Sequence, residues 1–328
     1  MKAVAAVPFT RTAVSKSSDL AIAVRDGLSG KGRKTLPSRF LYDDLGTALF
    51  EAISLLPEYG LTRADERILR QNARAIVARL PSPLSLSELG SGSGRKTRWI
   101  LEALASREPA VYYPIDISSA ALDRCRRELA GVAHARVIPI GADYRSGLEE
   151  VGMRRPRAGR LLLLFLGSTI GNFDRAESRA FLQEVRAHLR PGDGWLIGTD
   201  LLKPVPIMLA AYNDSLGVTA AFNRNLLARA NRELDADFQP AWFEHQARWD
   251  AEERRIEMHL VARKAHEVSI RDLGVSVRFR AEESIWTESS YKYEPEEPIR
   301  MGAEAGFDCA GQWIDREWPF AETLLVAR

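Results

Sequence analysis

The feature that most constrains the fold is the segment RLLLLFLG at 160–167, in which every residue between the first arginine and the last glycine is apolar. A short run of this kind predicts a strand, and its unbroken apolar character indicates burial on both faces, as in a central parallel strand. Strand-like and helix-like patterns alternate around it: strands at 84–90, 111–117, 135–144 and 191–201, and helices at 96–106, 118–129 and 175–190. This alternation predicts an α/β protein with a doubly wound parallel sheet.

The alternation stops near Lys203 and resumes close to the C-terminus. Residues 204–232 have a helical pattern, whereas residues 255–281 alternate apolar and polar side chains as antiparallel strands do. A helix and a strand after residue 292 return to the first pattern. We therefore predict an α/β lobe formed by 64–201 and 292–328, and a second α+β lobe formed by 10–63 and 202–291, after a flexible tail at 1–9.

The N-terminal part carries two further local signals. Residues 1–35 are polar and end rich in glycine and lysine, so we expect a tail that becomes a loop. Further on, Thr62 is followed three residues later by Asp65, which resembles a capping box before the amphipathic run that follows. We therefore expect Asp65 to help start that helix.

The composition excludes several classes of protein. Over 328 residues the formal net charge is +2, which gives no basic surface for nucleic acid or an anionic membrane. The cysteines, Cys125 and Cys309, lie far apart, and the histidines form no metal-binding spacing, so we expect neither a disulfide nor a metal site. There is no apolar run of membrane-spanning length and no apolar signal-peptide core, so we expect a cytoplasmic protein.

A glycine-rich loop, ELGSGSG at 88–94, follows the first strand of the alternating region. Glycines at the carboxyl end of such a strand let the backbone approach a bound cofactor. A dinucleotide-binding enzyme favours GxGxxG, whereas GxGxG behind an acidic residue is typical of S-adenosylmethionine-dependent methyltransferases. An ordinary tight turn between strand and helix is the alternative interpretation.

Acidic residues end the next two strands. Asp116 can accept both ribose hydroxyls of an adenosine, although a helix N-cap before Ser118 is the alternative and NAD is an equally suitable ligand. Asp143 and Tyr144 form an acid-plus-aromatic pair that can bind the adenine amino group and flank its ring, or simply form a surface turn. These residues predict an adenosine-containing ligand but do not decide the reaction.

The loop after the apolar strand reads GSTIGNF at 167–173. Small residues such as Gly167 leave room for a substrate, and the amide of Asn172 can position an amine or a carboxylate. The loop contains no Asp-Pro-Pro-Tyr motif, which argues against methylation of nucleic-acid bases. A glycine-rich loop with Asn172 as a turn residue is the alternative.

Several motifs resemble those of one enzyme family. The segments LPEYGLTR, FLGSTIGN, AAYNDSLGVTAAFNRN and WTESSYKY are similar to the histidine-specific Nα-methyltransferases of ergothioneine biosynthesis, and the similarity extends from about residue 35 to the C-terminus. The resemblance implies an enzyme that transfers methyl groups from S-adenosylmethionine to the α-amino group of free L-histidine, and we expect a monomer. It implies repeated transfer to give hercynine (trimethylhistidine) and S-adenosylhomocysteine, without a metal ion.

The resemblance also assigns roles to residues. The cofactor would contact Gly90, Lys96, Asp116, Asp143 and Tyr144, and Ser91 and Gly92 of the glycine loop complete this predicted site. The substrate would contact Tyr59 and Tyr212 through its carboxylate, Glu288 and Ser290 through its imidazole, Met258 beside the ring, and Gly167. Asn172 and Tyr42 would contact the amine as the catalytic residues. The chemistry agrees, because Glu288 can accept a hydrogen bond from a ring N–H while Ser290 serves the other nitrogen.

Three positions depart from the family's pattern. Tyr144 is a mild variant, Ser289 stands where an apolar residue is expected, and Gly60 stands where a second tyrosine is common. These departures concern the shape of the pocket. Three alternatives stay open: an Nα-methyltransferase of another free amino acid, an NAD-dependent oxidoreductase, and a ligand-binding relative without turnover.

Overall fold

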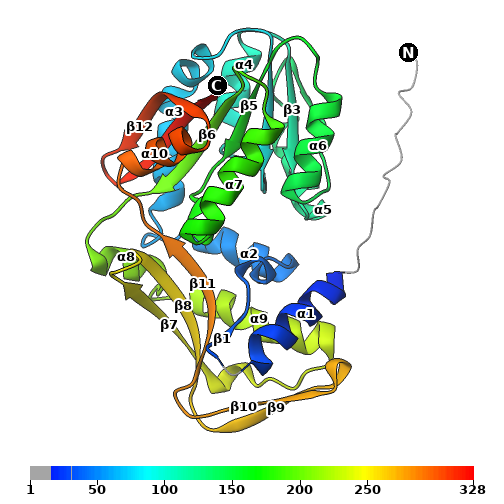
Figure 1. Ribbon diagram of the computed structural model, residues 1–328, viewed down its shortest axis with the longest axis vertical. Coiled ribbons are helices and arrows are strands. Elements are labelled where there is room, and N and C mark those ends of the chain that lie inside the picture. Colours follow the sequence, from blue (N-terminus) through cyan, green and yellow to red (C-terminus); the bar gives the residue numbers. More distant parts are fainter. Residues whose placement is uncertain (1–15, 31) are drawn as a thin grey trace.

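The computed structural model describes residues 16–30 and 32–328, so the predicted tail at 1–9 and the following residues 10–15 lie outside the described part of the chain. Two lobes lie one above the other along the longest axis (Figure 1). The upper lobe contains a seven-stranded sheet with the order β12-β13-β6-β5-β2-β3-β4. Its strands are β2 (Leu84–Leu89), β3 (Ala110–Ile115), β4 (Ala135–Val137), β5 (Arg160–Phe165), β6 (Gly194–Asp200), β12 (Phe307–Asp315) and β13 (Phe320–Ala327).

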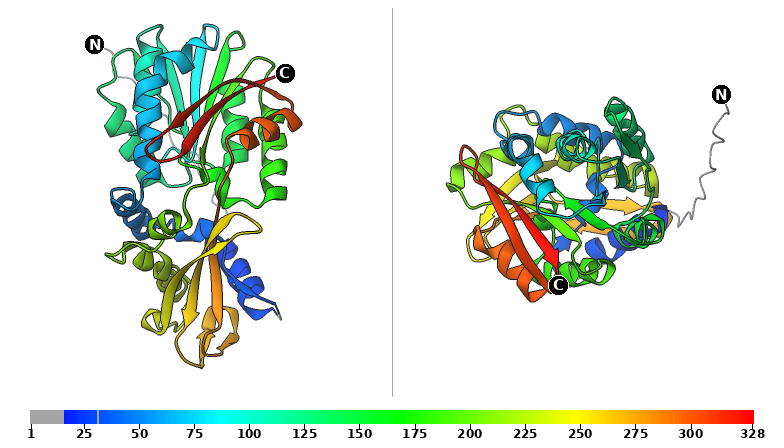
Figure 2. Two further views of the ribbon diagram at one scale, coloured as in Figure 1. Left: turned by 90° about the vertical axis from the view of Figure 1, so that its left-hand side faces the viewer. Right: turned by 90° about the horizontal axis from the view of Figure 1, so that it is seen from above.

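The direction of these strands confirms the predicted fold class. Strands β4, β3, β2, β5 and β6 are parallel to one another, whereas β13 runs antiparallel to β6 and β12 antiparallel to β13. Helices α3 (Leu61–Ala78), α4 (Arg98–Ala105) and α5 (Ser119–Leu129) pack on one face of the sheet, and α6 (Tyr144–Arg154), α7 (Arg175–His188) and α10 (Glu296–Glu304) on the other (Figure 2). The upper lobe is therefore a doubly wound, Rossmann-like α/β layer structure.

The apolar segment at 160–167 forms β5, between β2 and β6. Leu161, Leu163 and Phe165 pack into one hydrophobic core, and Leu162 and Leu164 pack into the core on the opposite face. Successive side chains of a strand point to opposite faces, so a strand covered on both sides needs apolar residues at every position. Burial of each such side chain contributes about 1.5–3 kcal/mol.

The lower lobe is built around a four-stranded sheet with the order β1-β11-β8-β7. Its strands are β1 (Lys34–Thr35), β7 (Phe243–Asp250), β8 (Arg255–Ala262) and β11 (Ser284–Tyr291), and β9 (His266–Ile270) pairs with β10 (Val275–Phe279) as a separate hairpin. The helices of this lobe are α1 (Lys16–Ser29), α2 (Asp44–Ile53), α8 (Val205–Ala211) and α9 (Val218–Leu234). The prediction of helices at 204–232 followed by antiparallel strands at 255–281 is confirmed.

Two local predictions were wrong. Lys16–Ser29, within the expected tail and loop, form helix α1, because Leu20, Val24 and Leu28 recur every four residues and are buried in the lower core. The third predicted strand, 135–144, is shorter than expected: β4 covers only Ala135–Val137, a single parallel bridge joins Ile140 to Ile115, and helix α6 starts at Tyr144.

The chain crosses between the lobes three times in the described residues, between α2 and α3, after β6 and after β11, and the last two crossings lie side by side. Leu201, after β6, forms a parallel bridge with Tyr293, after β11. The N–H of Tyr293 donates to the Asp200 carbonyl at 3.0 Å, and the N–H of Leu202 donates to the Tyr293 carbonyl at 2.9 Å. The division of the chain into two lobes with the boundaries given above stays a prediction.

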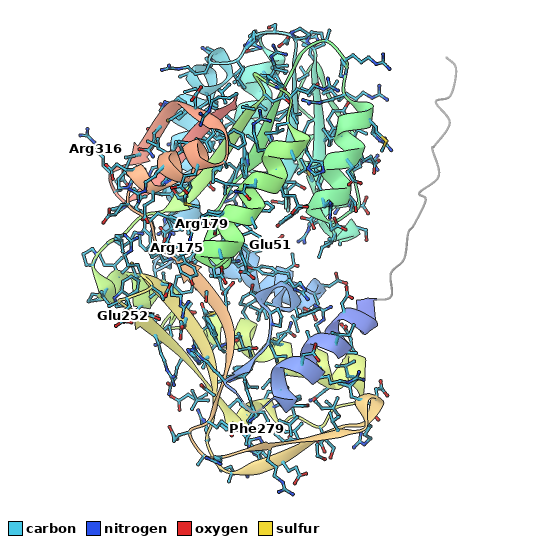
Figure 3. All side chains as sticks on the ribbon, viewed as in Figure 1. Glu51, Arg175, Arg179, Glu252, Phe279 and Arg316 are labelled. Atoms are coloured by element: carbon cyan, nitrogen blue, oxygen red, sulfur yellow. The ribbon has the colours of Figure 1, made fainter. Side chains whose placement is uncertain are left out.

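A second contact between the lobes is electrostatic. Glu51 of α2 lies where the lobes face each other (Figure 3) and pairs with Arg124 of α5 at 2.7 Å. Within residues 16–30 and 32–328, no helix has the length and apolar character needed to cross a membrane.

A buried ion pair should dominate the local stability of the upper lobe. Asp193, before β6, lies 2.7 Å from the Arg155 guanidinium, and the exposed fractions of the two side chains are 0% and 3%. Asp193→Asn leaves a buried cation without its counter-charge, so we expect the free energy of unfolding to fall by about 3 kcal/mol. Asp235→Asn removes the exposed ion pair with Arg271 and should change the free energy of unfolding by less than about 1 kcal/mol. Urea unfolding of both variants measures the difference; equal losses would contradict it.

Candidate active site

The glycine-rich loop turns sharply at the carboxyl end of β2. Gly90 has a φ of +68°, which favours glycine, and a Cβ added there would lie 3.1 Å from the Tyr144 hydroxyl. Ser91 Oγ is buried in the loop and has no hydrogen-bond partner among the described residues. A space that a side chain would fill and a hydroxyl group that needs a partner both fit a loop that holds a ligand.

Asp116 ties this loop to the end of β3. Its Oδ2 accepts a hydrogen bond from the Gly92 N–H at 3.0 Å, and its Oδ1 accepts one from the Ser118 N–H at 2.9 Å. The N-cap of α5 is Ser118, whose side chain accepts from the Ala121 N–H. The structure therefore rules out the N-cap interpretation of Asp116 and places its carboxylate beside the glycine loop.

Asp143 and Tyr144 lie at the start of α6. Asp143 is the N-cap of this helix, and its Oδ1 accepts from the Ser146 N–H at 2.9 Å. Tyr144 lies next to Gly90, and burial together with the nearby Asp116 carboxylate raises the pKa of its hydroxyl group. The structure thus brings Tyr144, Asp116 and the glycine loop together, while the contact of Asp143 with adenine stays a prediction.

Lys96 forms an ion pair that sequence analysis missed. Its ammonium group contacts Asp65 Oδ2, and the same oxygen accepts a hydrogen bond from the Gly167 N–H at 3.0 Å. The prediction that Asp65 caps a helix was wrong: α3 begins at Leu61 and Asp65 is fully buried inside it. Asp65 shares the buried stripe of α3 with Ile68 and Leu69, and this spacing was the available signal for its burial.

Three predicted tyrosines gather between the lobes although they lie far apart in the sequence. The ring centroids of Tyr59 and Tyr212 are 6.2 Å apart, and Phe50 contacts the rings of both Tyr42 and Tyr59. Burial raises the pKa of Tyr42 well above its usual value, and the charge of Glu288 raises it further. Burial likewise raises the pKa values of Tyr59 and Tyr212. At neutral pH the three side chains are therefore neutral hydrogen-bonding groups.

The predicted imidazole contacts lie on β11. Glu288 is opposite Met258 of β8, next to an irregularity in the strand pairing at Thr287. Burial raises the pKa of Glu288 to about 8, against a smaller opposing effect of Lys292. Ser290 Oγ lies 2.6 Å from the Tyr212 hydroxyl, which connects β11 to the tyrosines. The structure thus brings Glu288, Ser290 and Met258 together with the tyrosine group.

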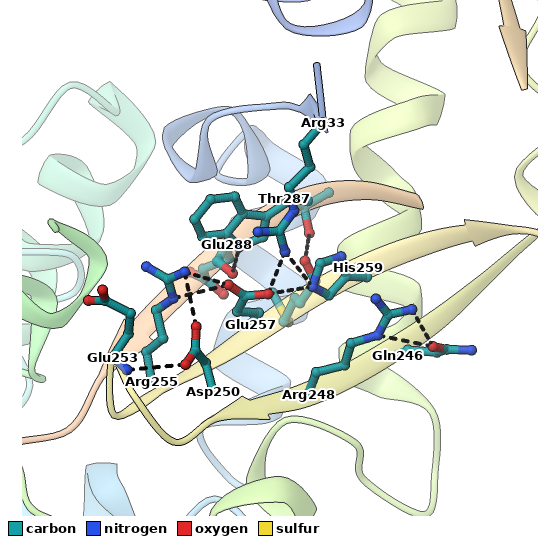
Figure 4. A network of polar contacts seen from close by, with 12 residues as sticks. Arg33, Gln246, Arg248, Asp250, Glu253, Arg255, Glu257, His259, Thr287 and Glu288 are labelled. Atoms are coloured by element: carbon teal, nitrogen blue, oxygen red, sulfur yellow. Dashed lines mark hydrogen bonds and ion pairs between the residues drawn. The ribbon is translucent and has the colours of Figure 1, made fainter. Parts of the chain in front are cut away.

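A separate polar network occupies alternate positions of β8 (Figure 4). Glu257 pairs with Arg33 at 2.5 Å and with Arg255 at 2.7 Å, and it lies 2.9 Å from His259 Nε2. Successive strand residues point to opposite faces, so this network and Met258 lie on opposite sides of β8. Among the described residues, no ion pair involves Glu288. The charge of Glu257 is therefore balanced within the polar network, whereas Glu288 lies outside that network.

Asn172 ends the short 3-10 helix η2 (Thr169–Asn172) that follows β5. A Cβ added at Gly171 would lie 2.9 Å from the Tyr291 carbonyl oxygen, so η2 packs directly against β11. Ser168, before η2, has a φ of 58° and accepts a hydrogen bond from the Asp200 N–H. Asn172 therefore lies close to the end of β11, and its contact with the substrate amine stays a prediction.

A buried charge cluster behind Tyr212 was also missed. Asp200 Oδ1 lies 2.7 Å from Lys203 Nζ, and Asp200 Oδ2 lies 2.8 Å from Lys292 Nζ. Burial alone would raise the pKa of Asp200, but the two ammonium groups outweigh it and lower the pKa below its usual value. The signal was present in the sequence, because Ser290 and Lys292 are two residues apart and therefore share one face of an extended chain.

Gly60 has a steric explanation. A Cβ at this position would lie 2.1 Å from the ring of Trp318, so no side chain fits while the tryptophan is in place. The Trp318 indole N–H donates to Asp200 Oδ1 at 3.1 Å. Trp318 thus fills the space in which a second tyrosine would lie.

Within residues 16–30 and 32–328, no group of three or more histidine, cysteine, aspartate or glutamate side chains could hold a metal ion. Cys125 is buried and Cys309 is exposed, and both are free thiols. The arrangement instead offers neutral hydroxyls, a buried carboxyl group and a glycine loop.

Comparison with known proteins gives a consistent result. The family described as histidine-specific, SAM-dependent methyltransferases matches residues 20–327. A histidine N-alpha-methyltransferase from Mycolicibacterium smegmatis is 41% identical over 92% of this chain and 93% of its own length. An ergothioneine biosynthesis protein 1 from Neurospora crassa is 32% identical over 86% of this chain and 32% of its own length. An L-tryptophan methyltransferase from Psilocybe serbica is 28% identical over 97% of this chain and 96% of its own length.

The raised pKa of Glu288 predicts a pH dependence of stability. In the unfolded chain this carboxyl group loses its proton near pH 4.5, whereas in the fold it keeps the proton up to about pH 8. The folded state thus binds more protons in this range, so the contribution of Glu288 to stability is lost as the pH rises from about 5 to 8. Without ligands, Glu288→Gln should reduce the slope of unfolding free energy against pH by up to about 1.4 kcal/mol per unit.

Urea unfolding at a series of pH values measures this slope. Glu252→Gln, at an exposed acid in the turn between β7 and β8, is the matched control and should leave the slope of the wild-type protein unchanged. Parallel profiles for Glu288→Gln and the wild-type protein would show that Glu288 is ionised in the fold.

Proposed function

The chain belongs to the histidine-specific, S-adenosylmethionine-dependent methyltransferase family, and on this basis we propose that it methylates the α-amino group of free L-histidine to give hercynine, for ergothioneine biosynthesis. The observation that carries the proposal is the buried group formed by Glu288 and Ser290 on β11 beside Tyr59 and Tyr212. This group offers a carboxyl and a hydroxyl for a ring with two nitrogens, next to neutral phenols suited to a carboxylate.

The proposed cofactor site lies at the glycine loop. Gly90, Ser91, Gly92, Asp116, Asp143 and Tyr144 would hold the adenosine part, and Lys96 would approach the charged end of the cofactor. S-adenosylmethionine supplies a methyl group that is already activated by the sulfonium. The narrow space beside Gly90 and the buried Ser91 hydroxyl support this assignment. Because the sulfonium already activates the methyl group, the proposed transfer needs no metal ion and no covalent intermediate.

The proposed substrate site holds histidine by both of its ends. Tyr59 and Tyr212 would bind the carboxylate, Glu288 and Ser290 the imidazole, and Met258 and Gly167 would line the pocket. The α-nitrogen would then lie near Asn172 and Tyr42. Because burial keeps the Tyr42 hydroxyl protonated, Tyr42 acts as a neutral hydrogen-bonding group that orients the amine. Catalysis is chiefly positioning in a pocket that contains little water.

Repeated transfer follows from the chemistry of the amine. An amine must be unprotonated to react, and burial disfavours the ammonium form. Each methylation removes an N–H but leaves a lone pair until the nitrogen carries three methyl groups. The trimethylated product has a fixed positive charge and cannot react again. We propose that the enzyme works as a cytoplasmic monomer, with the upper lobe for the cofactor, the lower lobe for the substrate, and no nucleic-acid or membrane partner.

The second candidate substrate is another free amino acid, and the similarity to an L-tryptophan methyltransferase favours tryptophan. A buried carboxyl group and hydroxyl group left without ring nitrogens to bind would disfavour tryptophan in this pocket. Family membership argues against the dinucleotide-dependent alternative.

Incubation with histidine and S-adenosylmethionine, without added metal, should give a product three methyl groups heavier than histidine. Fragmentation in a mass spectrometer should release trimethylamine and leave the imidazole unmodified. Tryptophan in the same assay is the control and should react far more slowly. Methyl groups on the ring nitrogens would contradict the proposed orientation of the substrate. Preferential methylation of tryptophan would show that histidine is not the preferred substrate.

Asp116→Ala should weaken binding of S-adenosylhomocysteine by about tenfold or more, because hydrogen bonds to a charged group contribute roughly 1.5–3 kcal/mol. Asp123→Ala, at an exposed position of the neighbouring helix α5, is the matched control and should leave the affinity unchanged. Isothermal titration calorimetry on both folded variants measures the effect. An unaltered dissociation constant for Asp116→Ala would remove Asp116 from the cofactor site.

A further inference from the structure

Lys292 is fully buried and connects the charge cluster to two proposed substrate contacts. Its Nζ lies 2.8 Å from Asp200 Oδ2, 2.9 Å from the Tyr212 hydroxyl oxygen and 2.9 Å from Ser290 Oγ. A lysine ammonium group has three N–H donors and no acceptor, so these three contacts use every donor. Lys292 therefore donates to both hydroxyl groups and accepts from neither.

This arrangement restricts the two hydroxyl groups. A hydroxyl group has one hydrogen to donate, and Lys292 occupies an acceptor position on each oxygen. The hydrogens of Tyr212 and Ser290 must then point away from Lys292. As described, Tyr212 donates to Ser290 at 2.6 Å, so both acceptor positions of Ser290 Oγ are filled and its hydrogen is directed elsewhere.

The net charge of the cluster formed by Asp200, Lys203 and Lys292 also affects what can bind next to Tyr212. Two ammonium groups, of Lys203 and Lys292, face a single carboxylate, that of Asp200. One positive charge is thus left uncompensated within the cluster, on the side where Tyr212 lies. A buried cation next to a phenol hydroxyl favours an anionic group bound to that phenol.

We propose that Lys292 is a positioning residue for substrate recognition: it directs the hydroxyl hydrogen of Ser290 toward the unprotonated ring nitrogen of a neutral imidazole, and its positive charge favours a substrate carboxylate beside Tyr212. The inference rests on the proposed function. With Ser290 as the donor, the ring N–H is left for Glu288, so the pair reads the two nitrogens as one acceptor and one donor. Lys292 itself touches no substrate atom in this arrangement; it acts through Tyr212 and Ser290.

The test compares Lys292→Met with Lys203→Met in the full-length enzyme. Both variants remove an ammonium group from Asp200, but only Lys292 contacts Tyr212 and Ser290. Lys292→Met should raise the KM for histidine by about 10- to 100-fold, the range expected for hydrogen bonds to a charged group. Its kcat should change by less than about fivefold, because histidine and the transition state lose the same contacts. Lys203→Met should change this KM by less than about threefold.

A double-mutant cycle shows whether Lys292 acts through Ser290. The KM increase of the double variant Lys292→Met/Ser290→Ala should be well below the product of the increases of the two single variants. Calorimetry should give S-adenosylhomocysteine dissociation constants within about twofold of the wild-type value for every variant. Should Lys292→Met fail to fold, Lys292→Gln, which keeps N–H donors without the charge, serves in the same comparison.

Equal KM increases for Lys292→Met and Lys203→Met would overturn the inference, because the effect would then come from Asp200. Single effects that multiply in the double variant would overturn it as well. Both results leave the proposed function intact, since the wild-type enzyme still methylates histidine. A wild-type enzyme that does not bind histidine would overturn the proposed function and this inference together.

Discussion

The burial of three charged groups at the junction of the lobes is the constraint on which the rest of the structure depends. Removing Asp200, Lys203 and Lys292 from water costs several kcal/mol for each ion, and only close pairing offsets that cost. Asp200 ends β6 of the upper sheet, and Lys292 follows β11 of the lower sheet. The ion pair between them therefore requires the two sheets to keep one relative position, and the backbone bonds around Tyr293 have the same requirement.

The same junction decides the chemistry of the pocket. Tyr212 and Ser290 lie directly on the charge cluster, and Glu288 lies two residues before Ser290 on the same strand. Desolvation is the common cause of the raised pKa values of the tyrosines and of Glu288. A pocket that keeps acids and phenols neutral also disfavours a charged ammonium group, which is the form of an amine that cannot react.

Sequence patterns predicted the features that depend on local periodicity. The apolar run of β5, the glycine loop and Asp116 all follow from the alternation of strands and helices, and the structure brings them together. Asp65 and Lys292 were missed because a charged residue in a helix or strand is usually exposed, and the local spacing that indicates their buried faces does not identify their partners. Those partners, Lys96 and Asp200, lie 31 and 92 residues away along the chain, a separation at which local patterns carry no information. Helix α1 was missed for another reason: the expectation of a tail and loop rested on the polar end of residues 1–35, which is rich in glycine and lysine, and not on the four-residue spacing of Leu20, Val24 and Leu28.

The contact between Gly60 and Trp318 limits how this pocket can change during evolution. Any side chain at position 60 collides with the indole ring, and loss of the indole removes a hydrogen bond to Asp200. A lineage that exchanges Gly60 for tyrosine must therefore first accept a smaller residue at position 318, and the reverse path must restore glycine before the tryptophan returns. The two positions, 258 residues apart, are thus expected to covary among homologues, and the order of their substitutions is fixed by steric exclusion.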